Sequence, residues 1–223
     1  MDTVHKKANK KRKKVTVPVR KTFRHGNLRQ ALLEAGIGLA SAGGPQAVVL
    51  REATRRAGVA PNAAYRHFSS HSDLLRAVRA AALSRLALAI EAEIGRLPNG
   101  QPSADHARAM LRAVGTGYLK FALQETGLFR TAFSVPDPVE EDRDAAKTGH
   151  TGLNPFQLLG SALDRMVEAG VLPPERRQGA EYLAWSAVHG LAFLIMEGPL
   201  SGASARNVKT LTERLLRMVE KGL

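Results

Sequence analysis

Several residue types and patterns that would indicate a function are missing from this 223-residue chain. It has no cysteine, which excludes a disulfide framework, a thiolate metal site and a cysteine nucleophile. No apolar run approaches the ~20 residues that a membrane-spanning helix needs, and the charged start lacks the apolar segment of a signal peptide. We therefore expect a soluble, cytoplasmic protein with no membrane partner.

The motifs that mark common enzymes are missing as well. There is no phosphate loop, dinucleotide fingerprint or His-Glu-x-x-His, and Gly198 stands at the wrong distance from Ser201 for a nucleophile elbow. His67 and His71 have the i, i+4 spacing of a zinc pair, but no third ligand lies near them in sequence. The acidic residues between 136 and 154 match no calcium loop, so we interpret this stretch as a mobile solvated loop. We predict no enzymatic activity, no catalytic residue, no metal and no cofactor.

No segment alternates apolar and polar residues as a strand would, so we predict an all-α protein of about nine helices. Helical periodicity, capping residues and Gly/Pro breaks place these helices at about 27–41, 50–57, 60–68, 73–97, 103–125, 128–133, 156–169, 176–196 and 207–221.

The net charge of +13 is confined to the first third of the chain. Residues 1–19 carry seven Lys/Arg against one Asp, and residues 20–79 carry ten against three acidic residues, whereas the remainder sums to zero. This distribution indicates a polyanion-binding head on a neutral body. The Lys-rich stretch 1–23 shows no hydrophobic periodicity, so we expect a disordered tail that either follows a DNA backbone or only keeps the protein soluble.

Residues 49–68, VLREATRRAGVAPNAAYRHF, have the pattern of a helix-turn-helix motif. Gly58 stands where the first helix must end, because glycine takes a positive φ without a Cβ clash. Pro61 suits the first turn of the second helix, where its missing N–H would have had no partner. An ordinary αα-corner with a solvated basic face is the alternative that this stretch alone leaves open.

The helices at 176–196 and 207–221 indicate an interface between two chains. The first is apolar on two faces, and a helix of this kind is either buried in its own domain or shared with a partner. Two such helices from each of two chains would form a four-helix bundle with twofold symmetry. A purely internal core is the alternative. The two apolar seams are Tyr182, Trp185, His189, Ala192 and Met196 on one side, and Leu183, Leu191 and Leu194 on the other.

Three segments of the head are together similar to the N-terminal domain of the tetracycline-repressor (TetR) family of bacterial transcriptional regulators. These are HGNLR from His25, LREATRRAGV from Leu50 and AAYRHF from Ala63. The stretch AWSAVHGLAFL from Ala184 also resembles the Trp-x-x-x-His-Gly helix of one TetR subfamily. Between about residues 80 and 179 only the helical rhythm matches.

The resemblance implies a basic tail at 1–23, a DNA-binding domain at 24–72 with its motif at 49–68, and an effector-binding and dimerisation domain at 73–223. It implies a homodimer on a palindromic operator, with the second helix of the motif in the major groove. Arginine and asparagine are suited to read guanine and adenine edges, and tyrosine and histidine to hold phosphates. The DNA-binding residues that it implies are Arg24, Arg51, Pro61, Asn62, Ala63, Tyr65, Arg66, His67 and His71.

This chain departs from the family pattern at three positions of the head. His71 stands where the family usually has a phosphate-gripping lysine, and histidine is largely neutral at pH 7. Val49 and Ala60 stand where Ser or Thr usually caps a helix, each worth about 1 kcal/mol. We expect weaker helix starts, with the basic tail adding nonspecific affinity.

The resemblance also implies a ligand pocket in the body. The bulky residues there are of types more often found as ordinary core than as ligand contacts. Arg and Lys are absent from the seam around His189, which favours a small hydrophobic effector. A ligand that tilts the long helix at 73–97 would move the two heads out of register. A DNA-binding or DNA-organising protein without an effector is the alternative function. The candidate pocket residues are Met110, Tyr118, Phe121, Phe129, Phe133, Trp185 and His189.

Overall fold

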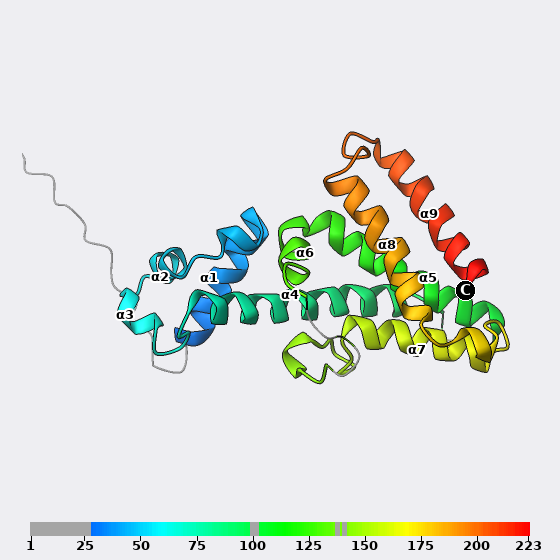
Figure 1. Cartoon of the computed structure of the whole chain (residues 1–223), viewed down its shortest axis with the longest axis horizontal. Helices are drawn as coiled ribbons and strands as arrows, with labels where there is room; N and C mark the ends of the chain where they lie inside the picture. Colours follow the sequence, from blue (N-terminus) through cyan, green and yellow to red (C-terminus); the bar gives the residue numbers. More distant parts are fainter. Residues whose placement is uncertain (1–27, 99–102, 137–138, 140–141) are drawn as a thin grey trace, which may run out of the picture.

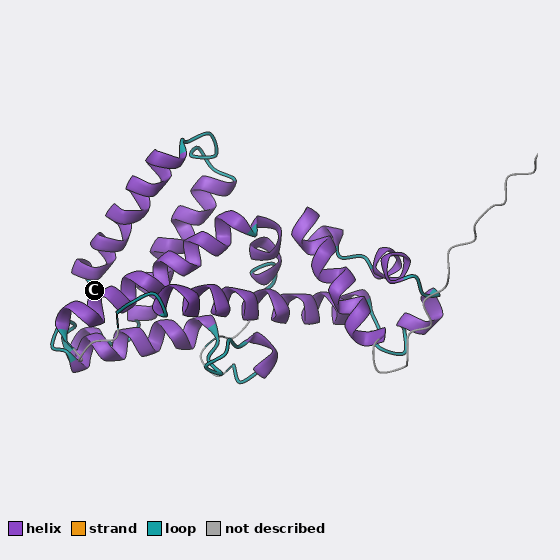
Figure 2. Ribbon diagram, turned by 180° about the vertical axis from the view of Figure 1, so that it is seen from behind, coloured by secondary structure: helices purple, strands orange, loops and turns teal. Residues whose placement is uncertain are grey.

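The fold was obtained as a computed structural model that describes residues 28–98, 103–136, 139 and 142–223. Within these residues every regular element is helical, which confirms the all-α prediction (Figures 1 and 2). The predicted tail at 1–23, Arg24 and the predicted helix start at residue 27 lie outside the described residues. The α-helices are α1 (Leu28–Gly43), α2 (Leu50–Ala57), α3 (Pro61–Ala64), α4 (His71–Ile94), α5 (Ala104–Gln124), α6 (Thr126–Ala132), α7 (Pro155–Glu168), α8 (Ala180–Met196) and α9 (Ala205–Gly222).

Side-chain caps explain where the long helices begin. The hydroxyl of Ser70 accepts the backbone N–H of Asp73 at the start of α4, and Ser103 and Ser204 cap α5 and α9 in the same way. At the start of α7, Asn154 and Gln157 form a reciprocal capping box. Each cap satisfies a backbone donor that would otherwise lack a partner at the helix terminus.

α1, α2, α3 and the first turns of α4 form one end of the molecule, which we call the head (Figure 1). Gly58 ends α2 with a φ of 69°, as expected from the sequence. The head core includes Leu32, Ala53, Ala64 and Phe68, all buried. Neither α2 nor α3 has a side-chain cap at its start, so the expected absence of caps at Val49 and Ala60 is confirmed.

The two largest differences from the predicted helix boundaries, of four residues each, are at the end of α3 and the start of α8. α3 ends at Ala64 rather than near Phe68, although the Ala64 carbonyl still accepts the N–H groups of both His67 and Phe68 and so holds the chain in a helical turn. α8 begins at Ala180 rather than near residue 176, because a short 3₁₀ turn at Pro174–Arg176 and a left-handed Gly179 (φ 77°) precede it. A right-handed helix cannot continue through a positive φ.

α4 runs from the head into the body, which comprises the rest of α4 and α5 to α9 (Figure 1). It packs against α1, α5, α6 and α7. The crossing with α5 is close, because a Cβ at Gly117 would lie only 2.6 Å from Ile90 Cα. The buried apolar residues of head and body form one continuous core along α4, so α4 is packed against both parts. The predicted domain boundary at residue 73 stays a prediction.

Candidate DNA-binding surface and ligand cavity

The head presents the side chains that the resemblance assigns to DNA. Asn62 and Arg66 are exposed, as are Arg51, Pro61 and His71. Tyr65 has 58% of its surface exposed although it is a large aromatic residue. Ala63 and His67 are half-buried. If Asn62 and Arg66 lay beneath other helices, this face could not meet a duplex; the structure leaves it open.

Packing beneath α3 fixes the orientation of these side chains. Ala64 and Phe68 are buried under the motif, and the guanidinium of Arg29 lies 5.1 Å from the centre of the Phe68 ring. On α2, the buried hydroxyl of Thr54 donates to the Arg51 carbonyl at 2.7 Å. Buried packing therefore holds α2 and α3 in place while most of their polar side chains face the solvent.

The arginines of α2 are not equivalent. Arg55 and Arg56 pair with Glu52 at 2.6 and 3.4 Å, and the hydrogen bond from Arg55 lowers the pKa of Glu52 to about 2. Arg51 and Arg66 make no ion pair with any described residue. Their charges are therefore the ones most available to phosphates or base edges.

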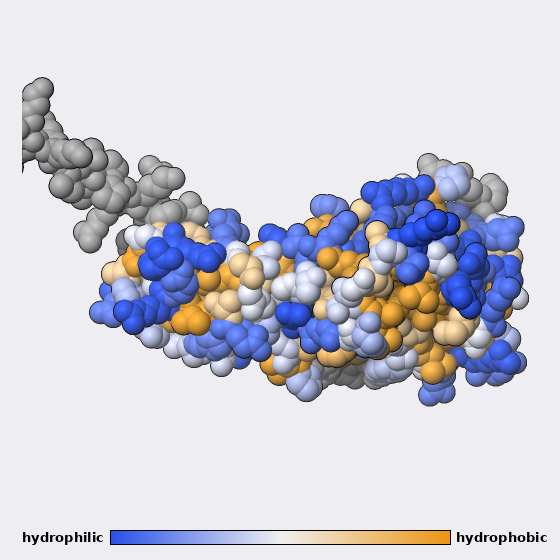
Figure 3. Space-filling view, turned by 90° about the horizontal axis from the view of Figure 1, so that it is seen from above, coloured by the Kyte–Doolittle hydropathy of each residue, from blue (hydrophilic) through white to orange (hydrophobic). Residues whose placement is uncertain are grey.

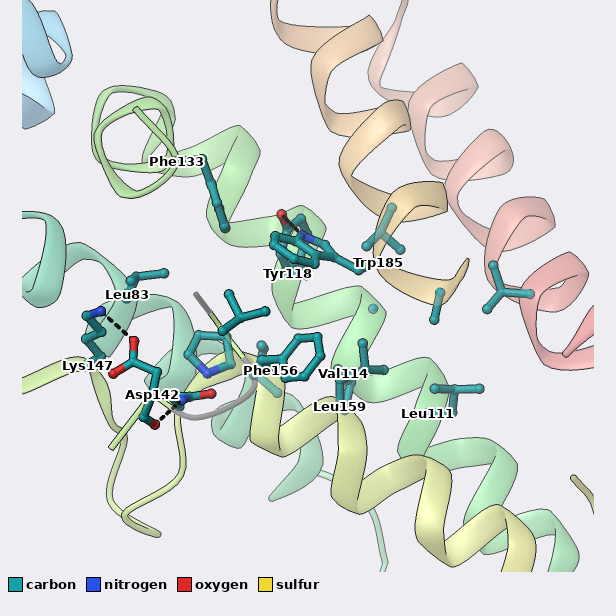
Figure 4. A pocket seen from close by; sticks show the side chains of 18 of the residues that line it. Leu83, Leu111, Val114, Tyr118, Phe133, Asp142, Lys147, Phe156, Leu159 and Trp185 are labelled. Carbon is teal, nitrogen blue, oxygen red and sulfur yellow. Dashed lines mark hydrogen bonds and ion pairs between the residues drawn. The ribbon is translucent and has the colours of Figure 1, made fainter. Parts of the chain in front are cut away.

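The body holds a cavity of about 80 Å³ between α4, α5, α7, α8 and α9 (Figure 4). Its wall is mostly apolar, with Leu83 from α4, Val114 from α5 and Leu159 from α7 among the lining residues. One edge is polar, where an ion pair joins Asp142 and Lys147. A site of this composition suits a ligand that is largely apolar.

A hydrogen-bonded aromatic group closes one end of the cavity. Trp185 donates its indole N–H to the Tyr118 hydroxyl at 2.9 Å, and that hydroxyl lies 2.7 Å from His189 Nδ1. Burial raises the pKa of Tyr118 and lowers the pKa of His189. The tyrosine therefore stays protonated and donates to a neutral imidazole, which we assign the Nε2–H tautomer on this network.

The structure brings together only part of the predicted pocket set. Tyr118, Phe133 and Trp185 line the cavity. Phe129 and His189 stand behind them, with ring centres 5.5 Å apart. The other two predicted residues, Met110 and Phe121, are buried but are not among the lining residues.

Several lining residues were not predicted. Phe156 and Leu159 lie one turn apart on α7, and the apolar face of that helix was the signal that could have found them. Asp142 was assigned to a solvated loop, and this assignment is wrong: its side chain is only 13% exposed and pairs with Lys147 in the cavity wall. Sequence spacing alone gave no signal for that contact.

The segment that carries Asp142 and Lys147 is fastened to α4. The Glu91 carboxylate accepts the N–H groups of His150 and Thr151 at 2.8 and 2.9 Å, and the Thr151 hydroxyl at 2.6 Å. Burial raises the pKa of Glu91, but these hydrogen bonds outweigh it and the net shift is downward. The Ser84 hydroxyl donates to the Thr148 carbonyl at 2.7 Å. A cavity wall is thus held directly to the helix that enters the head.

A second link joins α4 to the aromatic end of the cavity. Arg79 is buried on α4, and its Nη2 donates to the Val135 carbonyl at 2.8 Å. Val135 follows Phe133, which lines the cavity, by two residues. This hydrogen bond therefore ties the segment that follows Phe133 to α4.

Large apolar side chains remain exposed on the last two helices. Leu183 and Phe193 on α8 are 62% and 52% exposed, and Met218 on α9 is 60% exposed. Between them, Ser186 and Gly190 leave the middle of the exposed face of α8 small and uncharged. Figure 3 shows hydrophobic surface gathered on the body between hydrophilic patches. Exposed apolar residues grouped in this way mark an interaction surface.

A helix-turn-helix head joined by one long helix to a helical body with a cavity defines a class of DNA-binding transcriptional regulators. Residues 32–78 match the profile of "Bacterial regulatory proteins, tetR family", and residues 111–219 match "Tetracyclin repressor-like, C-terminal domain". The two matches together cover more than two thirds of the chain. The protein therefore belongs to the TetR family of transcriptional regulators, whose members are not enzymes.

Solved structures agree with this fold. A protein of unknown function from Rhodococcus sp. RHA1 is 25% identical, with a TM-score of 0.67 over 88% of this chain and 97% of its own. FadR from Bacillus subtilis, solved with stearoyl-CoA, is 14% identical, with a TM-score of 0.62 over 87% and 98%. PfmR from Thermus thermophilus is 18% identical, with a TM-score of 0.56 over 87% and 96%. No curated protein matches the sequence.

None of the helices in the described part of the chain combines the length and the apolar character needed to cross a bilayer. The described residues also contain no group of three or more His, Asp or Glu residues arranged to hold a metal ion.

Proposed function

We propose that this regulator is a cytoplasmic homodimeric repressor, released from a palindromic operator by a small hydrophobic effector. The observation that carries the proposal is the exposed face of α3, where Asn62 and Arg66 project from a buried base. Arg51, Pro61 and Ala63 would approach the same groove. Tyr65, His67 and His71 would hold the flanking phosphates, because hydroxyl and imidazole N–H groups are suitable donors.

The exposed apolar face of α8 and α9 supports the dimer. Leu183, Phe193 and Met218 lie on the two helices that the sequence assigns to the interface. Pairing this face with its copy would bury these side chains around the small residues Ser186 and Gly190. A twofold interface of this kind would also place two heads on the same side of the molecule, as a palindrome requires.

The two links to α4 support control by a ligand. A molecule that enlarges the cavity presses on Phe133 or on the Asp142–Lys147 wall, and these are joined to α4 through Arg79 and Glu91. Tilting α4 changes the separation of the two recognition helices, which a dimer needs at about 34–36 Å. The ligand shifts the equilibrium only if it binds the tilted state better than the DNA-bound one.

The volume of the cavity favours a second candidate, a regulator or DNA-organising protein without an effector. Its volume of about 80 Å³ is smaller than the ~300 Å³ or more of typical ligand sites. In the first proposal, the cavity must expand on binding. In the second, it is a packing defect and no small molecule weakens operator binding.

Selection of bound sites from random DNA tests the proposed function. The expected result is a palindrome whose half-site centres lie about 10 base pairs, or a multiple of this, apart. Recovery of no preferred sequence would overturn the repressor proposal and leave the DNA-organising alternative. With the selected operator, Asn62→Ala should lose specificity at one position per half-site, whereas Lys209→Ala on the distant α9 serves as a control that keeps it.

A further inference from the structure

A second hollow lies next to the apolar cavity and has the opposite chemistry. It is an open groove of about 550 Å³ between the end of α4, α5 and α9. Arg96, Arg112 and Arg217 each contribute a guanidinium to its wall, and Glu93 and Glu213 contribute carboxylates. We call it the arginine groove.

The cationic groups of the arginine groove are only partly satisfied. Arg96 shares Glu93 with Lys120, whose Nζ lies 2.8 Å from that carboxylate. Arg112 pairs with Glu220, and the guanidinium of Arg217 bonds to no described residue. Each arginine has five N–H donors, so most of the donors in the groove have no acceptor among the residues that the structure describes. Glu213 also lacks an ion pair with any residue that the structure describes. It is one carboxylate beside three guanidiniums, so it cannot satisfy the remaining donors.

Leu216 of α9 separates the arginine groove from the cavity, since its side chain lines both. Across from it stands Gly115 of α5, where an added Cβ would collide with Leu216 Cδ2. The two hollows lie against opposite faces of α5, and Leu216, packed on Gly115, is the one described residue that lines both. A rotamer change at Leu216 is therefore the movement that a connection between them requires.

We propose that the cavity and the arginine groove together form one site for an amphipathic organic anion. The apolar chain lies beside Trp185 and Val114, passes Leu216, and places a carboxylate or phosphate head among Arg96, Arg112 and Arg217. This inference rests on the proposed function, in which the cavity receives the effector, and it gives that effector a charge. It also explains how a cavity of small volume can serve as a ligand site, because only the end of the ligand's apolar chain needs to fit there.

The indole of Trp185 offers a direct test, because it is the only tryptophan of the chain and lines the cavity. Full-length protein is titrated with octyl phosphate, octanoate and 1-octanol, following Trp185 fluorescence and the heat of binding. We expect at least one anion to bind about tenfold or more tightly than the alcohol, since charge-assisted hydrogen bonds exceed neutral ones. Comparing the two anions distinguishes a phosphate head from a carboxylate head, and both results support the site.

Two substitutions on one face of α9 provide the matched variants. Arg217→Ala should weaken binding of the anion about fivefold or more and leave binding of 1-octanol unchanged. Arg206→Ala removes the same charge three helical turns away, about 16 Å along the axis, and should change neither. Circular dichroism and the unfolding midpoint verify that both variants are folded.

Each contrary outcome overturns the inference in a recognisable way. Equal binding of 1-octanol and the anions would show that the arginine groove takes no part in ligand binding. A hydrophobic effector, and so the proposed function, would remain possible. Heat of binding without a change in Trp185 fluorescence would show that the groove does not communicate with the cavity. No binding of any probe would refute the joined site, whereas failure of the proposed function would show separately, as the absence of a selected operator.

Discussion

Removal of the Tyr118 hydroxyl should destabilise the body by an amount that the structure allows us to estimate. Tyr118 is 5% exposed, and its oxygen links the Trp185 N–H to His189 Nδ1. Tyr118→Phe deletes two hydrogen bonds, each worth about 1 kcal/mol, and leaves a donor and an acceptor without their partner. We expect a loss of about 2–3 kcal/mol in the free energy of unfolding. For a chain of this size that corresponds to a fall of roughly 5–10 °C in Tm.

The same substitution has a pH dependence whose sign follows from His189. Burial lowers the pKa of His189, so the native state favours the neutral ring and the unfolded state binds more protons near and below its ordinary pKa of about 6.5. The stability contributed by this site is therefore fully present above about pH 6.5 and is lost as the pH falls. Protonation of Nδ1 also breaks the bond from Tyr118, so the difference between wild type and Tyr118→Phe should narrow, and not grow, as the pH falls towards the lowered native pKa of His189.

Urea unfolding at fixed protein concentration, at pH 7.5 and pH 5.5, measures both effects. Tyr65→Phe is the matched control, because its hydroxyl is on an exposed side chain and should leave stability within about 0.5 kcal/mol. A Tyr118→Phe protein as stable as wild type at pH 7.5 would show that the hydrogen-bonded group contributes nothing. A difference that grows at pH 5.5 would contradict the assigned protonation states.

Four further changes test the head and its link to the cavity. Val49→Thr supplies the missing cap of α2 and should stabilise the protein by about 1 kcal/mol in urea unfolding; no gain would mean that the cap geometry is not reached. His71→Lys should tighten operator binding and steepen its dependence on log salt by about 1, measured by gel shift. A variant beginning at Lys21 should bind DNA more weakly than the full-length protein, and equal affinity at equal salt would dispose of a role for the tail. Glu91→Gln should preserve operator affinity but reduce the release of DNA by a ligand of the cavity. Unchanged release would show that the hydrogen bonds of Glu91 to His150 and Thr151 do not link the cavity to α4.

Local sequence signals were sufficient for most of the fold because helix ends are encoded locally. Gly58 and Pro61 placed the corner of the motif, and Ser103 marked the start of α5 correctly. Boundaries were less accurate where a helix ends through backbone geometry alone. Arg176, Arg177 and Gln178 are all compatible with a helix, so the sequence did not show that the left-handed Gly179 separates them from α8.

The cavity could be predicted only where one helix face carries all the information. Trp185 and Tyr118 were found because each lies on the apolar side of a long helix, and both line the cavity. The Asp142–Lys147 wall depends on a segment folding back onto α4 through Glu91, about 50 residues earlier in the chain. Such a contact produces no periodic pattern in the sequence. A solvated charged loop and a charged segment that lines a cavity therefore cannot be distinguished from sequence alone.

In the proposed release mechanism, close packing along α4 is what would let a small cavity influence the head. Gly36 of α1 lies so close to α4 that a Cβ there would stand 2.8 Å from Val78 Cγ2, and Gly117 of α5 approaches the α4 backbone directly. Interfaces this tight cannot absorb a displacement by compression, since protein interiors are packed as densely as crystals. Under this proposal, a shift of Phe133 or of the Glu91-bound segment would move α4 as a rigid element. Because the buried core is continuous from Ile90 to Leu74, that movement would reach α1 and the recognition helix through packed side chains.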